Sequence, residues 1–121
     1  IDHFKSVNDT HGHMKGDKVL INVGQSLRLN APENAVTIRY GGEEFCILLP
    51  GLSAEQAEPI CEIIRNKAKL IDTDGIFVTL SIGVSEINEN GVPDLETALN
   101  KADVALYSAK KNGRDRVIIA G

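Results

Sequence analysis

The chain has 121 residues, 42% of them hydrophobic and 25% charged, which is typical of one globular domain. Its formal net charge of −4 excludes a broad basic surface for nucleic acid or anionic lipid, so we expect no nucleic-acid partner. No apolar run is long enough to span a bilayer, and Cys46 and Cys61 lack the CxxC spacing of a metal or redox motif. We therefore expect buried, inert thiols and a cytoplasmic location, in a parent protein that could itself be anchored to a membrane.

The N-terminal part of the chain predicts a strand end, a loop and a helix. Residues 1–5 are typical of a strand that runs into a turn, and we expect the natural chain to extend further at this end. Asn, Asp, His and Gly are frequent between Asn8 and Gly16, which favours a loop. A helix is predicted from Gly16 and Asp17 to Asn30. Its apolar residues recur at helical spacing: Val19, Leu20, Val23 and Leu27.

Residues 35–50 predict a β-hairpin. β-Branched and aromatic residues flank a glycine pair, Gly41 and Gly42, and two carboxylates, Glu43 and Glu44, follow it. Glycine has no side chain, so another group can approach its backbone closely. Hard divalent cations prefer carboxylate oxygens, and Mg²⁺ completes its shell with phosphate and water. This turn therefore suits a metal-bound polyphosphate, and the alternative interpretation is a turn with solvated acidic side chains.

A second helix is predicted after Ser53, because Ser53 and Gln56 form a capping-box pattern. Pro59 is expected either to kink this helix or to mark its true first turn. A turn is predicted over residues 72–75. The buried face of the helix is expected to comprise Ala57, Ile60, Cys61, Ile64 and Ala68.

The C-terminal part predicts a strand, a helix and a final strand. Polar and apolar residues alternate over 77–85, which indicates a half-buried strand, and a loop is predicted over 86–93. Asp94 is expected to cap a third helix, and a short strand is predicted over 117–120. The apolar stripe of that helix is expected to comprise Leu95, Leu99, Ala102, Leu106 and Ala109. Because helices and strands interleave while the hairpin is antiparallel, we expect an α+β fold with a mixed central sheet and packed helices.

Four separated motifs occur in a recognisable order. They are Ile1–Asp9 with Gly12-His13 and Gly16-Asp17, then Arg39–Phe45, then Ser81–Val84, and then Ala102–Lys110 with Gly113-Arg114. This set closely resembles the GGDEF domain of bacterial diguanylate cyclases, with Glu43 as the variant residue of the signature. The resemblance covers essentially the whole chain, so we expect residues 1–121 to be a single GGDEF domain that lacks its N-terminal strand and helix region.

The resemblance implies a palm-like fold related to class III nucleotidyl cyclases. It also implies the condensation of two GTP molecules into cyclic di-GMP with release of pyrophosphate, with Mg²⁺ or Mn²⁺ as the cofactor. Each domain of the family holds one GTP, so the expected partners are GTP and a second GGDEF domain in a homodimer. Cyclases of this kind usually follow a sensory or receiver domain, which we therefore expect in the parent chain.

The matching positions imply roles for single residues. Glu43 and the backbone carbonyl of Ile1 are implied to be metal ligands. Glu44 is implied to be the second catalytic carboxylate, which contacts metal or helps to handle the proton of the attacking 3′-hydroxyl. The implied substrate-binding residues are Phe4 and Lys5 on a phosphate-cradling loop, Asn8 and Asp17 for guanine, Gly41 and Gly42 for backbone access, and Lys110 and Arg114 for the triphosphate.

Two departures from the family pattern bear on function. The acidic metal ligand that the family places immediately before Ile1 does not stand in this sequence. The alternative function is therefore a catalytically impaired domain that serves as a GTP-binding or dimerising module. Asp2 belongs to the same signature, and its role is expected to be either functional or structural. The Arg-x-x-Asp product-inhibition site of many relatives is replaced by Pro32 and Ala35, so we expect no tight inhibitory product site of that type.

Overall fold

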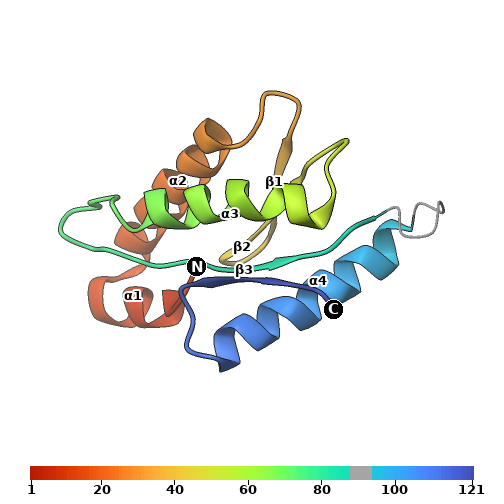
Figure 1. Cartoon of the computed structure of the whole chain (residues 1–121). Helices are drawn as coiled ribbons and strands as arrows, with labels where there is room; N and C mark the ends of the chain where they lie inside the picture. The colour runs from red at the N-terminus through yellow and green to blue at the C-terminus, as the bar shows by residue number, and fades with distance from the viewer. Residues whose placement is uncertain (88–93) are drawn as a thin grey trace.

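The computed structural model describes residues 1–87 and 94–121, which form four helices and four strands. In chain order these are α1 (Phe4–His11), α2 (His13–Asn30), β1 (Val36–Gly41), β2 (Glu44–Leu48), α3 (Ala54–Ala68), β3 (Ser81–Val84), α4 (Leu95–Lys111) and β4 (Arg116–Ile119). Helices α2 and α3 lie on one side of β3 and β4, and α4 lies on the other (Figure 1). The predicted α+β class, with an antiparallel hairpin and packed helices, is confirmed.

The segment from Asn8 to Gly16 is helical except at Gly12, so the predicted loop is wrong. α1 ends and α2 begins at Gly12, whose φ of 88° is readily adopted by glycine. Phe4 and Val7 of α1 are buried in the main core, and this tertiary burial outweighs the weak helix propensity of the residues that follow them. The predicted face of α2 is confirmed, because it buries Val19, Leu20, Val23 and Leu27.

α3 begins where the capping box predicts. The Gln56 amide donates to Ser53 Oγ at 3.2 Å, and the Ser53 amide donates to Gln56 Oε1 at 3.0 Å. Pro59 lies inside the helix, so the alternative in which it marks the first turn is wrong. Four of the predicted face residues are buried, namely Ala57, Cys61, Ile64 and Ala68, and Ile60 is half-buried.

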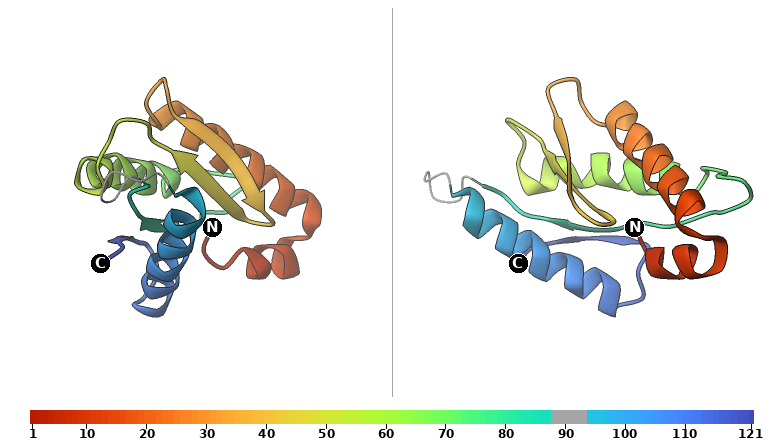
Figure 2. Two further views of the ribbon diagram at one scale, coloured as in Figure 1. Left: turned by 90° about the vertical axis from the view of Figure 1, so that its right-hand side faces the viewer. Right: turned by 180° about the vertical axis from the view of Figure 1, so that it is seen from behind.

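The strands form two small sheets in the described residues. β1 and β2 pair in antiparallel fashion, with Val36 opposite Leu48, and β3 and β4 pair in parallel, with Ser81 opposite Arg116. We expected one mixed sheet containing all of them. Figure 2 shows the hairpin standing apart from the β3–β4 pair.

Ile1 and Asp2 lie between the two sheets. The Ile1 α-amino group donates to the Glu43 carbonyl at 3.2 Å, and the Asp2 amide donates to the Thr79 carbonyl at 2.9 Å. These two residues therefore connect the hairpin turn with the extended stretch that leads into β3.

β3 is shorter than the predicted strand over 77–85, because the stretch before it has no paired strand in the part of the chain that is described. The predicted alternation is present in part: Val78, Leu80 and Val84 are buried, but Ser81, Ile82 and Gly83 are all half-buried. The loop predicted over 86–93 falls mostly outside the described residues. Asp94 caps α4 as predicted, because its Oδ1 accepts a hydrogen bond from the Thr97 amide at 3.2 Å.

α4 packs closely on β3. A Cβ atom added to Gly83 would lie 2.5 Å from the Leu106 amide nitrogen and nearer still to the Ala102 carbonyl oxygen. The buried residues of α4 are accordingly small: Ala98, Ala105 and Ala109. The predicted stripe is only partly correct. Ala109 is buried and Leu95 is 49% exposed, while the other three members are half-buried: Leu99, Ala102 and Leu106.

Of the two thiols that were expected to be buried, Cys61 is buried, whereas Cys46 is only half-buried. Burial raises the pKa of Cys46, and burial together with the nearby charges of Glu62 and Glu58 raises the pKa of Cys61 to about 11. Among the described helices, none combines the length and the hydrophobicity needed to cross a bilayer.

Candidate active site

The β1–β2 turn presents two half-buried carboxylates. Gly42 and Glu43 occupy the turn, Gly41 pairs with Glu44, and the register shifts by a bulge between Arg39 and Gly41. Arg39 Nε donates to the Gly42 carbonyl at 3.0 Å and braces the turn. A Cβ atom added to Gly41 or Gly42 would meet nothing within 4 Å. The space beside this turn is therefore open, in agreement with the backbone access expected of both glycines.

Glu43 and Glu44 line a cavity of about 660 Å³, together with Ile1, Lys110 and residues of β2, β3 and α4. Lys110 and the carboxylates of Asp2, Glu43 and Glu44 lie close enough to the Ile1 backbone nitrogen to act on it electrostatically. The structure brings these four predicted site residues together.

Two cations lie at and beyond the C-terminal end of α4. Lys110 is in the last turn of α4, and Arg114 lies in the short loop before β4. Both side chains are half-buried, and neither has a hydrogen bond or ion pair with another of the described residues. Arg114 does not line the cavity that contains Glu43. Both cations therefore have the charge and the freedom to bind an anion.

The N-terminus of α1 is not capped by a side chain. Its N-cap, His3, has a left-handed φ of 55°, and the Val7 amide donates to the His3 carbonyl at 3.2 Å. The amides of Phe4 and Lys5 precede that first helical bond, so they are free to bind an anion such as phosphate. The Phe4 side chain is buried in the core and the Lys5 side chain is exposed.

The two residues expected to bind guanine lie at the junction of α1 and α2. A Cβ atom added to Gly16 would overlap the amide oxygen of Asn8, so the Asn8 side chain lies against α2 beside Gly16. Asp17 follows Gly16 in α2 and is exposed, whereas Asn8 is half-buried. Neither residue lines the cavity at the hairpin turn.

Asp2 has the structural role that was one of its two expected alternatives, although its partners lie far away in the sequence. Its side chain accepts hydrogen bonds from Thr79 Oγ1 and Ser81 Oγ, both at 2.6 Å, and from the Asp115 amide at 3.2 Å. Asp2 is 4% exposed and ties the N-terminus to β3 and to the loop before β4. Sequence reasoning missed Asp115, because no local spacing links residues that are 113 positions apart.

The donor set fits a hard divalent cation. Within the described residues, no group of three or more His, Cys, Asp and Glu side chains is arranged so that it could hold a metal ion. Glu43 and Glu44 offer carboxylate oxygens at the cavity that Ile1 also lines, and the Ile1 carbonyl is the backbone oxygen expected to join them. Mg²⁺ commonly takes one or two protein carboxylates and completes its shell with substrate phosphate and water. These residues would therefore hold such an ion together with a polyphosphate.

Comparison with known proteins gives consistent matches. A family model described as "Diguanylate cyclase, GGDEF domain" matches residues 1–116. The chain is 42% identical to diguanylate cyclase A of Treponema denticola over 127 residues, which cover 99% of this chain and 33% of that protein. It is 40% identical to diguanylate cyclase DosC of Escherichia coli K12 over 120 residues, which cover 97% of this chain and 26% of that protein. The chain thus spans a third or less of these relatives.

A solved structure has the same fold. The active GGEEF domain of a diguanylate cyclase from Vibrio cholerae matches with a TM-score of 0.92 and 35% sequence identity, covering 100% of this chain and 78% of that chain. The family match extends over nearly all of the chain and includes the Gly41–Phe45 turn and both cations. The chain therefore belongs to the GGDEF domain family of diguanylate cyclases.

Proposed function

We propose that this domain binds GTP and, together with a second copy, condenses two GTP molecules into cyclic di-GMP. The observation that carries this proposal is the gathering of Glu43, Glu44 and Lys110 around one cavity beside Ile1. Relatives that are about 40% identical over nearly the whole chain are named diguanylate cyclases, which supports the same activity here.

In this proposal the triphosphate is held from two sides. Lys110 and Arg114 neutralise phosphate charge, Lys110 as a point charge and Arg114 as a fork that can bind two oxygens. The free amides of Phe4 and Lys5 at the start of α1 add donors at the positive end of the helix dipole. Asn8 and Asp17 are the proposed guanine ligands, because an amide and a carboxylate complement the donors and acceptors of that base.

The turn carboxylates act at the reacting phosphate. Glu43 would hold the divalent ion, which the family requires, and the metal when bound would offset charge on the phosphate oxygens. Mg²⁺ or Mn²⁺ would suit these ligands, because both ions prefer oxygen donors. Glu44 would either contact the ion or accept the proton of the attacking 3′-hydroxyl.

The reaction requires two copies of the domain. The 3′-oxygen of one GTP forms a bond to the α-phosphorus of the other, the bond from that phosphorus to pyrophosphate breaks, and the hydroxyl proton passes to a base. A second, reciprocal attack closes the ring, so two GTP molecules yield one cyclic di-GMP and two pyrophosphates. Because each copy holds one substrate, positioning by both copies supplies much of the rate acceleration.

The test is magnesium-dependent turnover of GTP by the full-length parent protein, with products separated by chromatography. Glu43→Gln should lower the rate by about 100-fold or more, because it removes charge where the metal and phosphate meet. Glu58→Gln, an exposed residue of α3, is the matched control and should leave the rate unchanged. The rate per subunit should also fall on dilution to monomer, and a constant rate would refute the two-copy mechanism.

A second candidate function is a GTP-binding or dimerising module without catalysis. Within the described residues, no group of three or more His, Cys, Asp or Glu side chains is arranged so that it could hold a metal ion. This function predicts that the wild-type protein binds a GTP analogue but turns over GTP no faster than Glu43→Gln does. Product formation well above that variant would exclude it.

We further infer that the domain works within a longer protein. The curated relatives are three to four times longer than the matched region, as coverage of 33% and 26% indicates. A linked sensory or receiver domain would control the encounter of two copies, and GTP as substrate favours a cytoplasmic location. Activity that is independent of every linked domain would argue against such control.

A further inference from the structure

The loop between α4 and β4 has an unusual backbone conformation. Gly113, Arg114 and Asp115 have consecutive positive φ angles of 118°, 64° and 46°. Glycine adopts such angles readily, but in other L-residues the Cβ atom crowds the backbone, and arginine has no compensating short polar side chain. Contacts elsewhere in the molecule must therefore hold Arg114 and Asp115 in this conformation.

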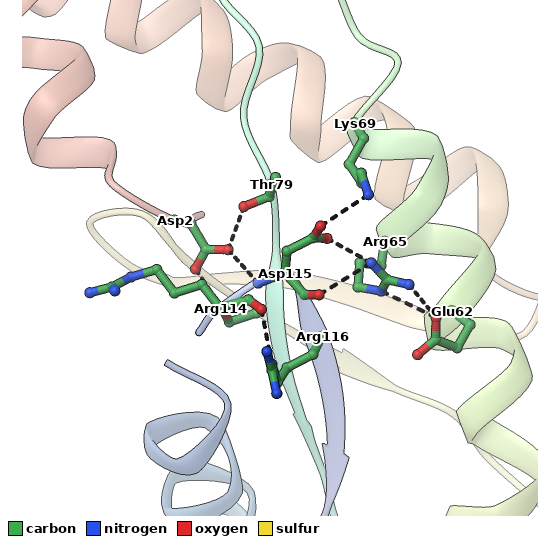
Figure 3. A network of polar contacts seen from close by, with 9 residues as sticks. Asp2, Glu62, Arg65, Lys69, Thr79, Arg114, Asp115 and Arg116 are labelled. Carbon is green, nitrogen blue, oxygen red and sulfur yellow. Dashed lines mark hydrogen bonds and ion pairs between the residues drawn. The ribbon is translucent and has the colours of Figure 1, made fainter. Parts of the chain in front are cut away.

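Every polar group of Asp115 is engaged. Its amide donates to Asp2 Oδ2 at 3.2 Å, and its carbonyl accepts from Arg65 Nη1 at 3.3 Å. Its two carboxylate oxygens accept from Arg65 Nη1 at 2.6 Å and from Lys69 Nζ at 2.9 Å. Partial burial alone would raise the pKa of Asp115, but the hydrogen bonds from Lys69 and Arg65 lower it overall. Asp115 is therefore stabilised as an anion by two cations, and its backbone is held by Asp2 and Arg65 (Figure 3).

The partners of Asp115 are themselves fixed. Arg65 is 15% exposed, and its Nη2 and Nε donate to Glu62 Oε2 at 2.6 and 3.1 Å within α3. Asp2 is anchored on the other side by the hydroxyls of Thr79 and Ser81. The loop between α4 and β4 is thus bound on one side to α3 and on the other, through Asp2, to the N-terminal end of β3.

Arg114 is immobilised at its backbone only. Its amide donates to the Ala109 carbonyl at 2.9 Å, and its carbonyl accepts from Arg116 Nε at 3.0 Å. Its guanidinium has no partner among the described residues, and in Figure 3 the side chain extends to the left, away from Asp115, Arg65 and Lys69 and on the side where Asp2 is drawn. The network therefore fixes where the side chain starts and leaves the charged end free for a ligand.

We propose that Asp115 is a positioning residue. Held by Arg65 of α3 and by Lys69 at the C-cap of that helix, it keeps Arg114 in the backbone conformation that aims its guanidinium at the triphosphate. This inference rests on the proposed GTP site. It assigns α3, which contributes none of the predicted ligands, a part in setting nucleotide affinity. It predicts that Asp115 acts on GTP through Arg114 and by no other route.

A double-mutant cycle tests this route. The dissociation constant of a non-hydrolysable GTP analogue with Mg²⁺ is measured by calorimetry on wild type, Asp115→Ala, Arg114→Ala and the double variant. Loss of a charge-assisted contact should weaken binding about tenfold in each single variant. If Asp115 acts through Arg114, the double variant should bind no more weakly than Arg114→Ala, so the two effects are not additive.

Two further variants separate positioning from general destabilisation. Asp115→Asn should bind more tightly than Asp115→Ala, because asparagine tolerates positive φ and keeps an acceptor for Arg65. Asp94→Ala is the matched control, since it removes the Asp cap at the opposite end of α4 and should leave the dissociation constant unchanged. If Asp115→Ala is not folded by its melting curve, Lys69→Ala replaces it in the cycle, with a smaller expected loss of about threefold.

The outcomes distinguish this inference from the function on which it rests. The change at residue 115, or at residue 69 where it replaces 115, is compared in two backgrounds, wild type and Arg114→Ala. If it weakens binding of the analogue equally in both, the positioning role alone is overturned. No binding of the analogue by the folded wild-type protein would overturn both proposals.

Discussion

Gly83→Ala should destabilise the domain by pushing α4 away from β3. The new Cβ atom would lie 2.5 Å from the Leu106 amide nitrogen and closer to the Ala102 carbonyl oxygen. Both are backbone atoms of one helix, so no side-chain rotation can relieve the overlap. Restoring an ordinary contact of about 3.4 Å requires a helix shift of more than about 0.9 Å, because the Ala102 oxygen is nearer than the Leu106 nitrogen, and such overpacking costs roughly 1–3 kcal/mol.

The assay is thermal unfolding followed by circular dichroism. For a domain of 121 residues, an unfolding entropy of about 2.1 cal/mol/K per residue converts 1 kcal/mol into about 4 °C. A loss of about 2 kcal/mol should therefore lower Tm by about 8 °C. Turnover should fall as well, because α4 carries Lys110.

Gly24→Ala is the matched control for this substitution. Its new Cβ atom would lie 3.4 Å from the Phe45 ring, which is an ordinary contact, and it replaces glycine inside α2. Helix propensity alone should then stabilise the domain by about 1 kcal/mol and raise Tm by about 4 °C. If Gly83→Ala melts at the wild-type temperature or above it, the close approach of α4 to β3 does not depend on glycine.

Three other predictions address the site and the core. Gly16→Ala should displace the Asn8 amide, which lies against Gly16, and weaken binding of a GTP analogue by about tenfold while α2 stays helical; unchanged affinity by calorimetry would contradict the guanine role of Asn8. The folded-state pKa of Cys61 is raised from 9.0 to about 11. The contribution of its protonated thiol to the free energy of unfolding is therefore fully present below pH 9 and is lost between about pH 9 and 11. In denaturant titrations, wild type should therefore lose about 3 kcal/mol more than Cys61→Ala over that range, and equal losses would disprove the shift. Cyclic di-GMP should show no tight binding that depends on residues 32–35, and calorimetric binding that vanishes when those residues are changed would overturn this expectation.

Local signals predicted the elements whose causes are local. The Ser53–Gln56 capping box sets the start of α3, and the alternation before Val84 identifies the buried side of the stretch leading into β3. The motif order was also sufficient to identify the family, since its signature residues lie on short contiguous segments.

Elements that depend on distant contacts were not predicted. α1 is helical across residues that favour loops, because Phe4 and Val7 are buried against the core. α4 lies very close to Gly83, a residue of another element. The residues that α4 buries are therefore small alanines, and Leu95 does not lie on the buried face. The contact between Asp2 and Asp115 brings together opposite ends of the chain and leaves no local pattern.

The division of the strands into two sheets has a consequence for the response to ligand. Glu43 and Glu44 belong to the hairpin, whereas Lys110 and Arg114 belong to α4 and the loop that pack with the other sheet. A nucleotide that touches both sets adds a polar bridge between two sheets that also share a hydrophobic core and the contacts of Ile1 and Asp2, and it can bind most tightly only when their spacing is correct. Occupancy should then slow hydrogen exchange at amides of both sheets, including those that no ligand atom contacts. Bound substrate would in this way stabilise the position of the two sheets relative to each other.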